Sequence, residues 1–293
     1  MSNIVVSPHS LSTLAGIEIL RNGGNAIDSA IATNIVQGVV APETCGIGGD
    51  LFALIWINGE NKPYCLDSSG YAGSNVDPSS LSSYTNIPLD HPMSVTVPGA
   101  VRGWYAMHER FGRLEMKDLF SQAIEVCSKG FKVSSELHQS LKSHEETLKI
   151  QDSGKELYPF GKVPNIGDTV QRTMLGRTLK SISDQGSDYF YSGKASEAIS
   201  DSLSNIVTTE DISSFHPQWI EPLSIEIYGK IGWVTPPHTQ SYLTLATLKI
   251  YEMLDSGSND IDLHTLIESY RAAASQRDDI TDDYENIDLF PGL

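Results

Sequence analysis

Residues 21–54, RNGGNAIDSAIATNIVQGVVAPETCGIGGDLFAL, limit the possible folds more than any other stretch of the chain. Residues 26–39 are apolar or small at nearly every turn, and a helix with so little polar surface is buried on most sides. The glycines before it predict the end of a preceding helix, and Asn25 is a candidate cap for the buried one. The glycines within 46–49 predict a tight turn before an apolar strand at 51–57. The stretch therefore predicts a closely packed unit of helix, turn and strand.

The order and spacing of GGNAIDSAIA, GIGG and the apolar strand resemble the N-terminal region of the gamma-glutamyltransferase family of N-terminal nucleophile hydrolases. Four further motifs follow in the family order and extend the resemblance over essentially all 293 residues. They are VPGAVRGW at 97–104, the aspartate-aromatic-tyrosine-glycine unit at 188–193, the Pro-Pro turn at 236–241, and the helix with His264, Glu268, Arg271 and Arg277.

The resemblance implies an α+β fold, a four-layer αββα sandwich that a second subunit completes. The helices at 8–22 and 25–40 would form an outer layer over the sheet. We expect residues 1–293 to be a single domain that corresponds to the family's larger subunit, without the smaller catalytic subunit. The implied partners are that smaller subunit, from the same precursor, and a small-molecule amide substrate. A heterodimer or a dimer of heterodimers is expected, and no cofactor or metal is implied.

Charge and apolar content narrow the classes of partner. The formal net charge is −17 and the sequence pI is 4.7, so the chain repels phosphate backbones and nucleic acid is not expected as a partner. No apolar run reaches the length of about 18 residues that a membrane helix needs. The three cysteines are far apart and suggest neither a disulfide framework nor a metal site. We expect a cytoplasmic protein, and whether a signal peptide precedes this chain stays open.

Apolar spacing and turn residues predict the remaining elements. Ser7 is a candidate cap for the first helix, and residues 68–90 predict a long polar loop. A short strand is expected at 94–97, and hairpins are expected around Gly59 and Gly229. Further helices are expected at 8–20, 100–111, 119–130, 133–147, 171–186, 195–203, 242–254 and 262–277.

The catalytic chemistry implied by the resemblance does not lie in this chain. In the family a precursor cleaves itself, and the new N-terminal threonine attacks an amide while its own amine acts as the base. The family's motif, two threonines followed by His or a similar residue, is absent here, so no catalytic residue is expected within residues 1–293. Residues 167–169, Gly-Asp-Thr, look like the family's cleavage site, but their neighbours match an internal turn of the larger subunit. We therefore interpret Thr169 as a turn residue.

Other catalytic patterns are also missing. The eight histidines are scattered without an HExxH motif, and no GxSxG nucleophile elbow occurs. His238, in the Pro-Pro turn, is interpreted as a surface residue, with a pocket-lining role as the alternative.

This chain is expected to contribute walls of the substrate pocket. Asp50 stands where the family usually has another glycine, and a cap, a substrate contact or a solvent-exposed side chain all stay open for it. The candidate substrate-binding residues are Asp67, Ser68, Ser69 and Tyr71, with Asp50 and Gln240.

The sharpest departure from the family follows Asp67. Family members commonly carry an Arg-Glu pair there and a further arginine that grips the substrate's alpha-carboxylate. This chain has Ser-Ser-Gly-Tyr-Ala-Gly at 68–73, and no Arg or Lys occurs between Lys62 and Arg102. A guanidinium binds a carboxylate through two parallel hydrogen bonds, and serine cannot replace its charge. Arg102 is the nearest candidate replacement, although its position favours an exposed helix residue.

Three functions stay open. The first is hydrolysis or transfer of an amide-linked acyl group, such as gamma-glutamyl in glutathione metabolism, through a threonyl ester. The second is an amidase or acylase that acts on a non-glutamyl amide. The third is a non-catalytic member that only binds a partner. A Thr-Thr motif in the reading frame after residue 293 would favour the enzymes.

Overall fold

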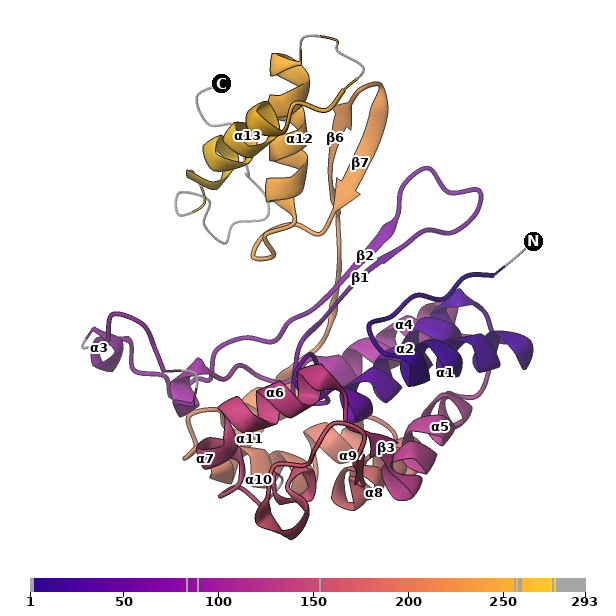
Figure 1. Cartoon of the computed structure of the whole chain (residues 1–293), viewed down its shortest axis with the longest axis vertical. Coiled ribbons are helices and arrows are strands. Elements are labelled where there is room, and N and C mark those ends of the chain that lie inside the picture. The colour runs from indigo at the N-terminus through magenta and orange to yellow at the C-terminus, as the bar shows by residue number, and fades with distance from the viewer. Residues whose placement is uncertain are drawn as a thin grey trace. The chain divides into compact units, whose positions relative to one another are not determined.

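The computed structural model describes residues 3–82, 84–88, 90–152, 154–255, 257, 260–275 and 277. The chain divides into two compact units (Figure 1). The first unit comprises Met1–Leu51 and Ser68–Pro217, and the second comprises Phe52–Asp67 and Gln218–Leu293. The expectation of one domain over residues 1–293 stays a prediction.

The first unit is built around the helix α2 (Ala26–Val40), as the sequence predicts (Figure 1). Its side chains Ile31, Ile35, Val36 and Val39 are at most 2% exposed. The helices α1 (Ser10–Arg21), α4 (Ala100–Phe111) and α5 (Met116–Lys129) pack against it, and α8 (Thr173–Gln185) packs on α5. The almost wholly apolar sequence of α2 is therefore explained by three helical neighbours.

The N-termini of α1 and α2 are each capped by the side chain of the preceding residue. Asn25 caps α2 as predicted, since its side chain accepts from the backbone of Ile27 and Asp28, and the Asp28 carboxylate accepts from the backbone of Asn25. The expected cap on α1 is wrong, because the His9 ring and not Ser7 accepts from the Leu11 backbone. The Ser7 hydroxyl instead contacts other side chains and the carbonyl of His9.

Short elements complete the first unit. The expected helix at 133–147 is interrupted at His144, where α6 (Ser135–Ser143) ends and α7 (Glu145–Leu148) begins. The expected strand at 94–97 is reduced to a bridge between Ala72 and Thr96. The other short elements are α3 (Pro78–Leu81), β3 (Phe131–Lys132), β4 (Thr169–Val170), α9 (Asp188–Tyr191), α10 (Lys194–Ser202), α11 (Thr209–Ser214), and 3-10 turns at Pro92–Ser94, Lys155–Leu157 and Pro159–Gly161.

The described residues of the second unit form two small sheets and two helices. One sheet has the order β1 (Leu51–Ile55), β2 (Tyr64–Ser68) and β5 (Gln218–Ile220), and β5 was not predicted. The other is the predicted hairpin of β6 (Leu223–Ile227) and β7 (Lys230–Val234). The helices α12 (Tyr242–Leu254) and α13 (Leu263–Ser275) pack on each other, with a core of Tyr242, Leu243, Ala246 and Ala273.

The three cysteines are free thiols. Burial raises the pKa of Cys65 to about 11 and that of Cys127 to about 12. Cys45 is partly buried, and burial also raises the pKa of its thiol. Among the described helices, none combines the length and the apolar content needed to cross a lipid bilayer.

Candidate functional site

The Pro98-Gly99 turn before α4 joins three motifs that lie far apart in the sequence. The backbone amides of Gly99 and Ala100 both donate to the Gly49 carbonyl, at 2.9 Å each. The Ser68 hydroxyl donates to the Gly99 carbonyl at 2.8 Å, and the Val97 amide donates to the Tyr71 carbonyl at 2.9 Å. The turn therefore fixes both the glycine loop before β1 and the segment after β2.

The closeness of these segments explains why glycine occurs here. A Cβ atom on Gly99 would lie 1.8 Å from the Ser68 carbonyl oxygen. A Cβ atom on Gly70 would lie 1.8 Å from the Val97 carbonyl oxygen, and Gly70 also has a φ of +69°. No other residue type fits either position without displacing backbone.

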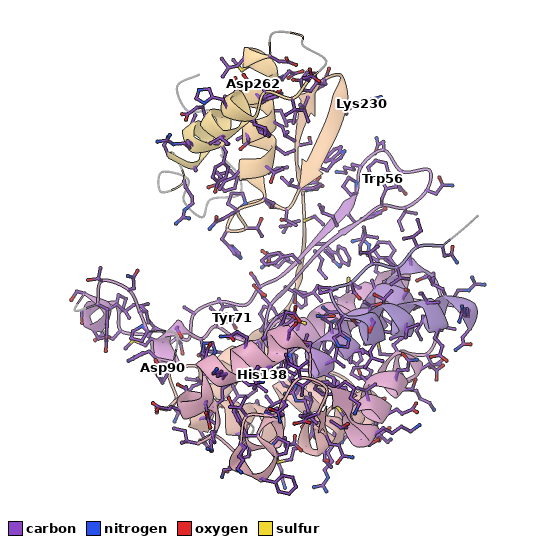
Figure 2. The ribbon with its side chains drawn as sticks, viewed as in Figure 1. Trp56, Tyr71, Asp90, His138, Lys230 and Asp262 are labelled. Carbon is purple, nitrogen blue, oxygen red and sulfur yellow. The ribbon has the colours of Figure 1, made fainter. Side chains whose placement is uncertain are left out.

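Tyr71 anchors the segment after β2 to α11. Its hydroxyl donates to the Asp211 carbonyl at 2.6 Å, while 43% of the residue remains exposed. Figure 2 labels Tyr71 on the first unit. The Asp211 carboxylate accepts from both the amide and the hydroxyl of Ser74, at 3.0 Å each, and also completes the capping box with Thr208. Partial burial acts to raise the pKa of Asp211, but these hydrogen bonds outweigh it, and the pKa is lowered.

Arg102 is buried, so the expectation of an exposed helix residue is wrong. The residue is 9% exposed, and its guanidinium donates to the carbonyls of Ser213, at 3.0 Å, and Phe215. The guanidinium carbon lies 4.3 Å from the centre of the Tyr191 ring, and Nη2 lies 3.8 Å from the Asp188 carboxylate. The sequence does not reveal this role, because the partners lie about a hundred residues away along the chain, but the aromatic motif at 188–193 was a usable signal.

The predicted site residues are divided between the two units. Ser68 is fully buried, Ser69 is half-buried, Tyr71 is half-exposed and Asp50 is exposed, and these four belong to the first unit. Asp67 and Gln240 belong to the second unit. The Pro98-Gly99 turn brings Ser68, Tyr71 and the backbone beside Asp50 together. The substrate-binding roles of all six residues stay predictions.

Within the second unit, Asp67 has a partner that the sequence analysis missed. Its carboxylate is 11% exposed, and Oδ2 lies 3.9 Å from Nε2 of His238. The His238 ring meets the Phe52 ring edge-on, with 5.8 Å between centres. His238 is thus partly exposed, at 44%, and is also part of a specific aromatic and acidic environment.

Gln240 begins a cavity on the second unit. The cavity has a volume of 520 Å³ and lies against α12 and α13. Its other lining residues are mostly apolar: Leu243, Thr244, Thr247, Leu248, Leu266, Ile267 and Tyr270. Gln240 can therefore offer one amide to a mainly apolar surface.

Two chemical alternatives gain no support from the described residues. Thr169 lies in β4 and not in a turn, and its hydroxyl accepts from the Lys132 ammonium at 2.8 Å. Within the described ranges, no three His, Cys, Asp or Glu side chains are grouped so as to hold a metal ion. That Thr169 has no catalytic role stays a prediction.

A comparison with known proteins shows to which family this chain belongs. The family model described as gamma-glutamyltranspeptidase matches residues 12–289, nearly the whole chain. The chain belongs to the gamma-glutamyltranspeptidase family. The resemblance that the sequence motifs indicated is therefore confirmed at the level of the family.

Individual members show how much of the protein is present. The glutathione hydrolase-like YwrD proenzyme of Bacillus subtilis is 30% identical over 96% of this chain and 55% of its own length. The oxamate amidohydrolase proenzyme of Klebsiella pneumoniae is 28% identical over 98% of this chain and 56% of its own. The chain thus spans about half the length of the curated relatives it matches.

A solved structure establishes the fold. The gamma-glutamyltranspeptidase of Helicobacter pylori superposes with a TM-score of 0.84 at 26% identity, over 95% of this chain and 84% of that one. The predicted α+β fold of the N-terminal nucleophile hydrolase type is confirmed by this likeness.

Proposed function

We propose that this chain is the larger-subunit part of a precursor that becomes an amide hydrolase or acyl transferase. Family membership supports the reaction class, and relatives of about twice the length that are named proenzymes support a catalytic part outside residues 1–293. In the proposed reaction the threonine hydroxyl attacks the amide carbonyl, and its proton passes by way of the threonine amine to the departing amine. Water or an acceptor amine then cleaves the threonyl ester.

The acyl group that we propose carries no free carboxylate where gamma-glutamyl has its alpha-carboxylate. The observation that carries this proposal is the burial of Arg102, whose guanidinium is engaged by two carbonyls, a ring face and Asp188. The segment from Ser68 to Tyr71 supplies hydroxyls and no positive charge. A wall of this kind suits a neutral acyl group, whereas an unpaired carboxylate would lose its hydration without a compensating cation.

The test compares two substrates that differ only in that carboxylate. The complete, processed protein is assayed on gamma-glutamyl-p-nitroanilide and on 4-aminobutyryl-p-nitroanilide, with a panel of neutral acyl anilides beside them. A buried charge pair is typically worth about 2–5 kcal/mol, so an enzyme with the arginine would prefer the glutamyl substrate by roughly 30-fold to several thousand-fold in kcat/KM. Here we expect a preference below about tenfold.

Two outcomes would contradict the proposal. A glutamyl preference above roughly 30-fold would show that a base from the other half replaces the arginine. A processed protein that cleaves no amide in the panel would favour the non-catalytic, partner-binding alternative.

The assembly and the location are proposals of the same kind. The two halves would remain together as a heterodimer, and an intact-mass spectrum of the full-length product would show two chains. A cytoplasmic location would be checked by cell fractionation.

A further inference from the structure

Two asparagines of this chain, Asn22 and Asn58, are followed directly by glycine. Such an asparagine can modify itself, because the backbone nitrogen of the glycine can attack the carbonyl carbon of the asparagine side chain. Glycine favours this attack, since it has no Cβ atom beside the nitrogen and its backbone turns freely. Both pairs are exposed, and the glycines have similar φ angles of +92° and +94°. Sequence and exposure therefore do not distinguish the two pairs.

Hydrogen bonding does distinguish them, and the Asn58-Gly59 pair is the less restrained. It lies in residues 56–63, the connection between β1 and β2 (Figure 1). The Glu60 amide donates to the Ile57 carbonyl across the pair, at 3.1 Å. Among the described residues, neither the side-chain amide of Asn58 nor the backbone N–H of Gly59 has a hydrogen-bond partner. A Cβ atom on Gly59 would meet nothing within 4 Å. No bond of its own therefore keeps the Gly59 nitrogen from turning toward the Asn58 side chain.

The Asn22-Gly23 pair forms the C-terminal end of α1 and is held there. The backbone amides of Asn22, Gly23 and Gly24 donate to carbonyls of residues 18–20, at 2.9, 3.3 and 3.0 Å. Gly24 is also tightly packed, because a Cβ atom there would lie 2.7 Å from the Ile19 side chain. If the Gly23 nitrogen turned onto the Asn22 side chain, its own bond would break and the bond of Gly24 would be disturbed. Attack at this pair therefore requires the end of α1 to open first.

We propose that Asn58 deamidates spontaneously in the folded protein, whereas the end of α1 protects Asn22. The Gly59 nitrogen forms a bond to Cγ of Asn58 and loses its proton, and the side-chain amide group leaves as ammonia. A water molecule then opens the cyclic imide at either carbonyl. One opening gives aspartate, and the other gives isoaspartate, in which the main chain runs through the former side chain. Both products add a negative charge to the connection that leads into β2, the strand that carries Asp67.

Peptide mapping by mass spectrometry tests the proposal in the full-length protein. The protein is incubated warm, at mildly alkaline pH, in water labelled with heavy oxygen. We expect the Asn58 peptide to gain a labelled acid, as both isomers, at least about tenfold faster than the Asn22 peptide. In the same protein unfolded in urea, the two rates should agree within about threefold, because the restraint at the end of α1 is gone.

Two variants locate the reaction in the connection. Asn58→Gln should abolish the product there, because the longer side chain closes a less favourable ring. Asn61→Gln is the control and should leave the reaction of Asn58 unchanged, since Asn61 is exposed in the same connection but precedes a lysine.

Several outcomes would overturn the proposal. They are equal rates at the two sites in the folded protein, no product at Asn58, or aspartate formed there without isoaspartate. A rate difference that persists in urea would show that the fold does not protect Asn22.

Discussion

At the scale of single residues, the buried guanidinium of Arg102 is stabilised by its surroundings. Two carbonyls accept from it, the Tyr191 ring covers one face, and the exposed Asp188 balances part of its charge. Arginine suits this position because its planar fork can satisfy two acceptors while it stacks on an aromatic ring. Its removal would leave the carbonyls of Ser213 and Phe215 without this donor.

We predict that Arg102→Met destabilises the complete protein by about 2–3 kcal/mol, the range for losing hydrogen bonds from a charged donor. The free energy of unfolding is measured in urea. The control is Arg177→Met on the exposed face of α8, which should change it by less than about 0.5 kcal/mol. Equal effects of the two substitutions would contradict the anchoring role of Arg102.

We predict that the stabilisation from Asp211 depends on pH. Its pKa is lowered in the folded protein, so its stabilisation is complete above the ordinary value of 3.8 and is lost as the pH falls through the lower folded value. Asp211→Ala should cost about 1–2 kcal/mol at pH 7 and at pH 5, because a cap and a loop anchor are lost. Urea unfolding at pH 7, 5 and 3 should show this difference shrinking only at the lowest pH. Asp201→Ala, an exposed change on α10, is the control and should show no such trend.

Contacts at this scale were the least predictable from the sequence. The local cap at Asn25 was predicted because all its groups lie within three residues. The partners of the Arg102 guanidinium lie within residues 188–215. Asp67 and its partner His238 are 171 residues apart in the sequence. Spacing rules describe neighbours along one element and carry no information on such partners.

At the scale of elements, the Pro98-Gly99 turn sets the positions of the predicted pocket walls. We predict that Gly99→Ala destabilises the protein by about 3 kcal/mol or more, because the new methyl group would overlap the Ser68 carbonyl. Gly46→Ala is a matched control, since a Cβ atom there meets nothing within 4 Å. Thermal unfolding of the complete protein measures both, and a small shift for Gly99→Ala would show that the walls can move apart.

Elements with their own sequence signals were predicted well. The bounds of α4 and α12 match the prediction, and the hairpin of β6 and β7 was predicted around Gly229. The missed strand β5 has three residues, and it forms only because β2 offers an edge in register, with Cys65 opposite Ile220. Short strands of this kind depend on a partner and not on a pattern.

At the scale of the whole molecule, each unit leaves surfaces uncovered. The second unit exposes Leu254 on α12 and Leu263, Ile267 and Tyr270 on α13, and the first exposes Ile4 and Val6. Exposed apolar side chains grouped on one face are uncommon in proteins that act alone.

We therefore predict that residues 1–293 expressed alone are insoluble or molten and hydrolyse no gamma-glutamyl anilide or neutral anilide. Near-ultraviolet circular dichroism and anilide assays test this, with the full-length protein as the control. A sharp, cooperative melt of the isolated monomer, or its catalytic turnover, would contradict the prediction.

The burial of Cys65 and Cys127, and the partial burial of Cys45, has a practical consequence for chemical labelling. Maleimides react with thiolates, and at pH 7 a thiol of pKa 11, such as Cys65, is ionised in only about one molecule in ten thousand. Cys127 is less ionised still, and burial also suppresses the ionisation of Cys45. A cysteine introduced at an exposed position of this chain would therefore take up a fluorophore or spin label far ahead of Cys65 and Cys127, and ahead of the partly buried Cys45. Distances between such labels could then be measured with Cys65 and Cys127 left in place.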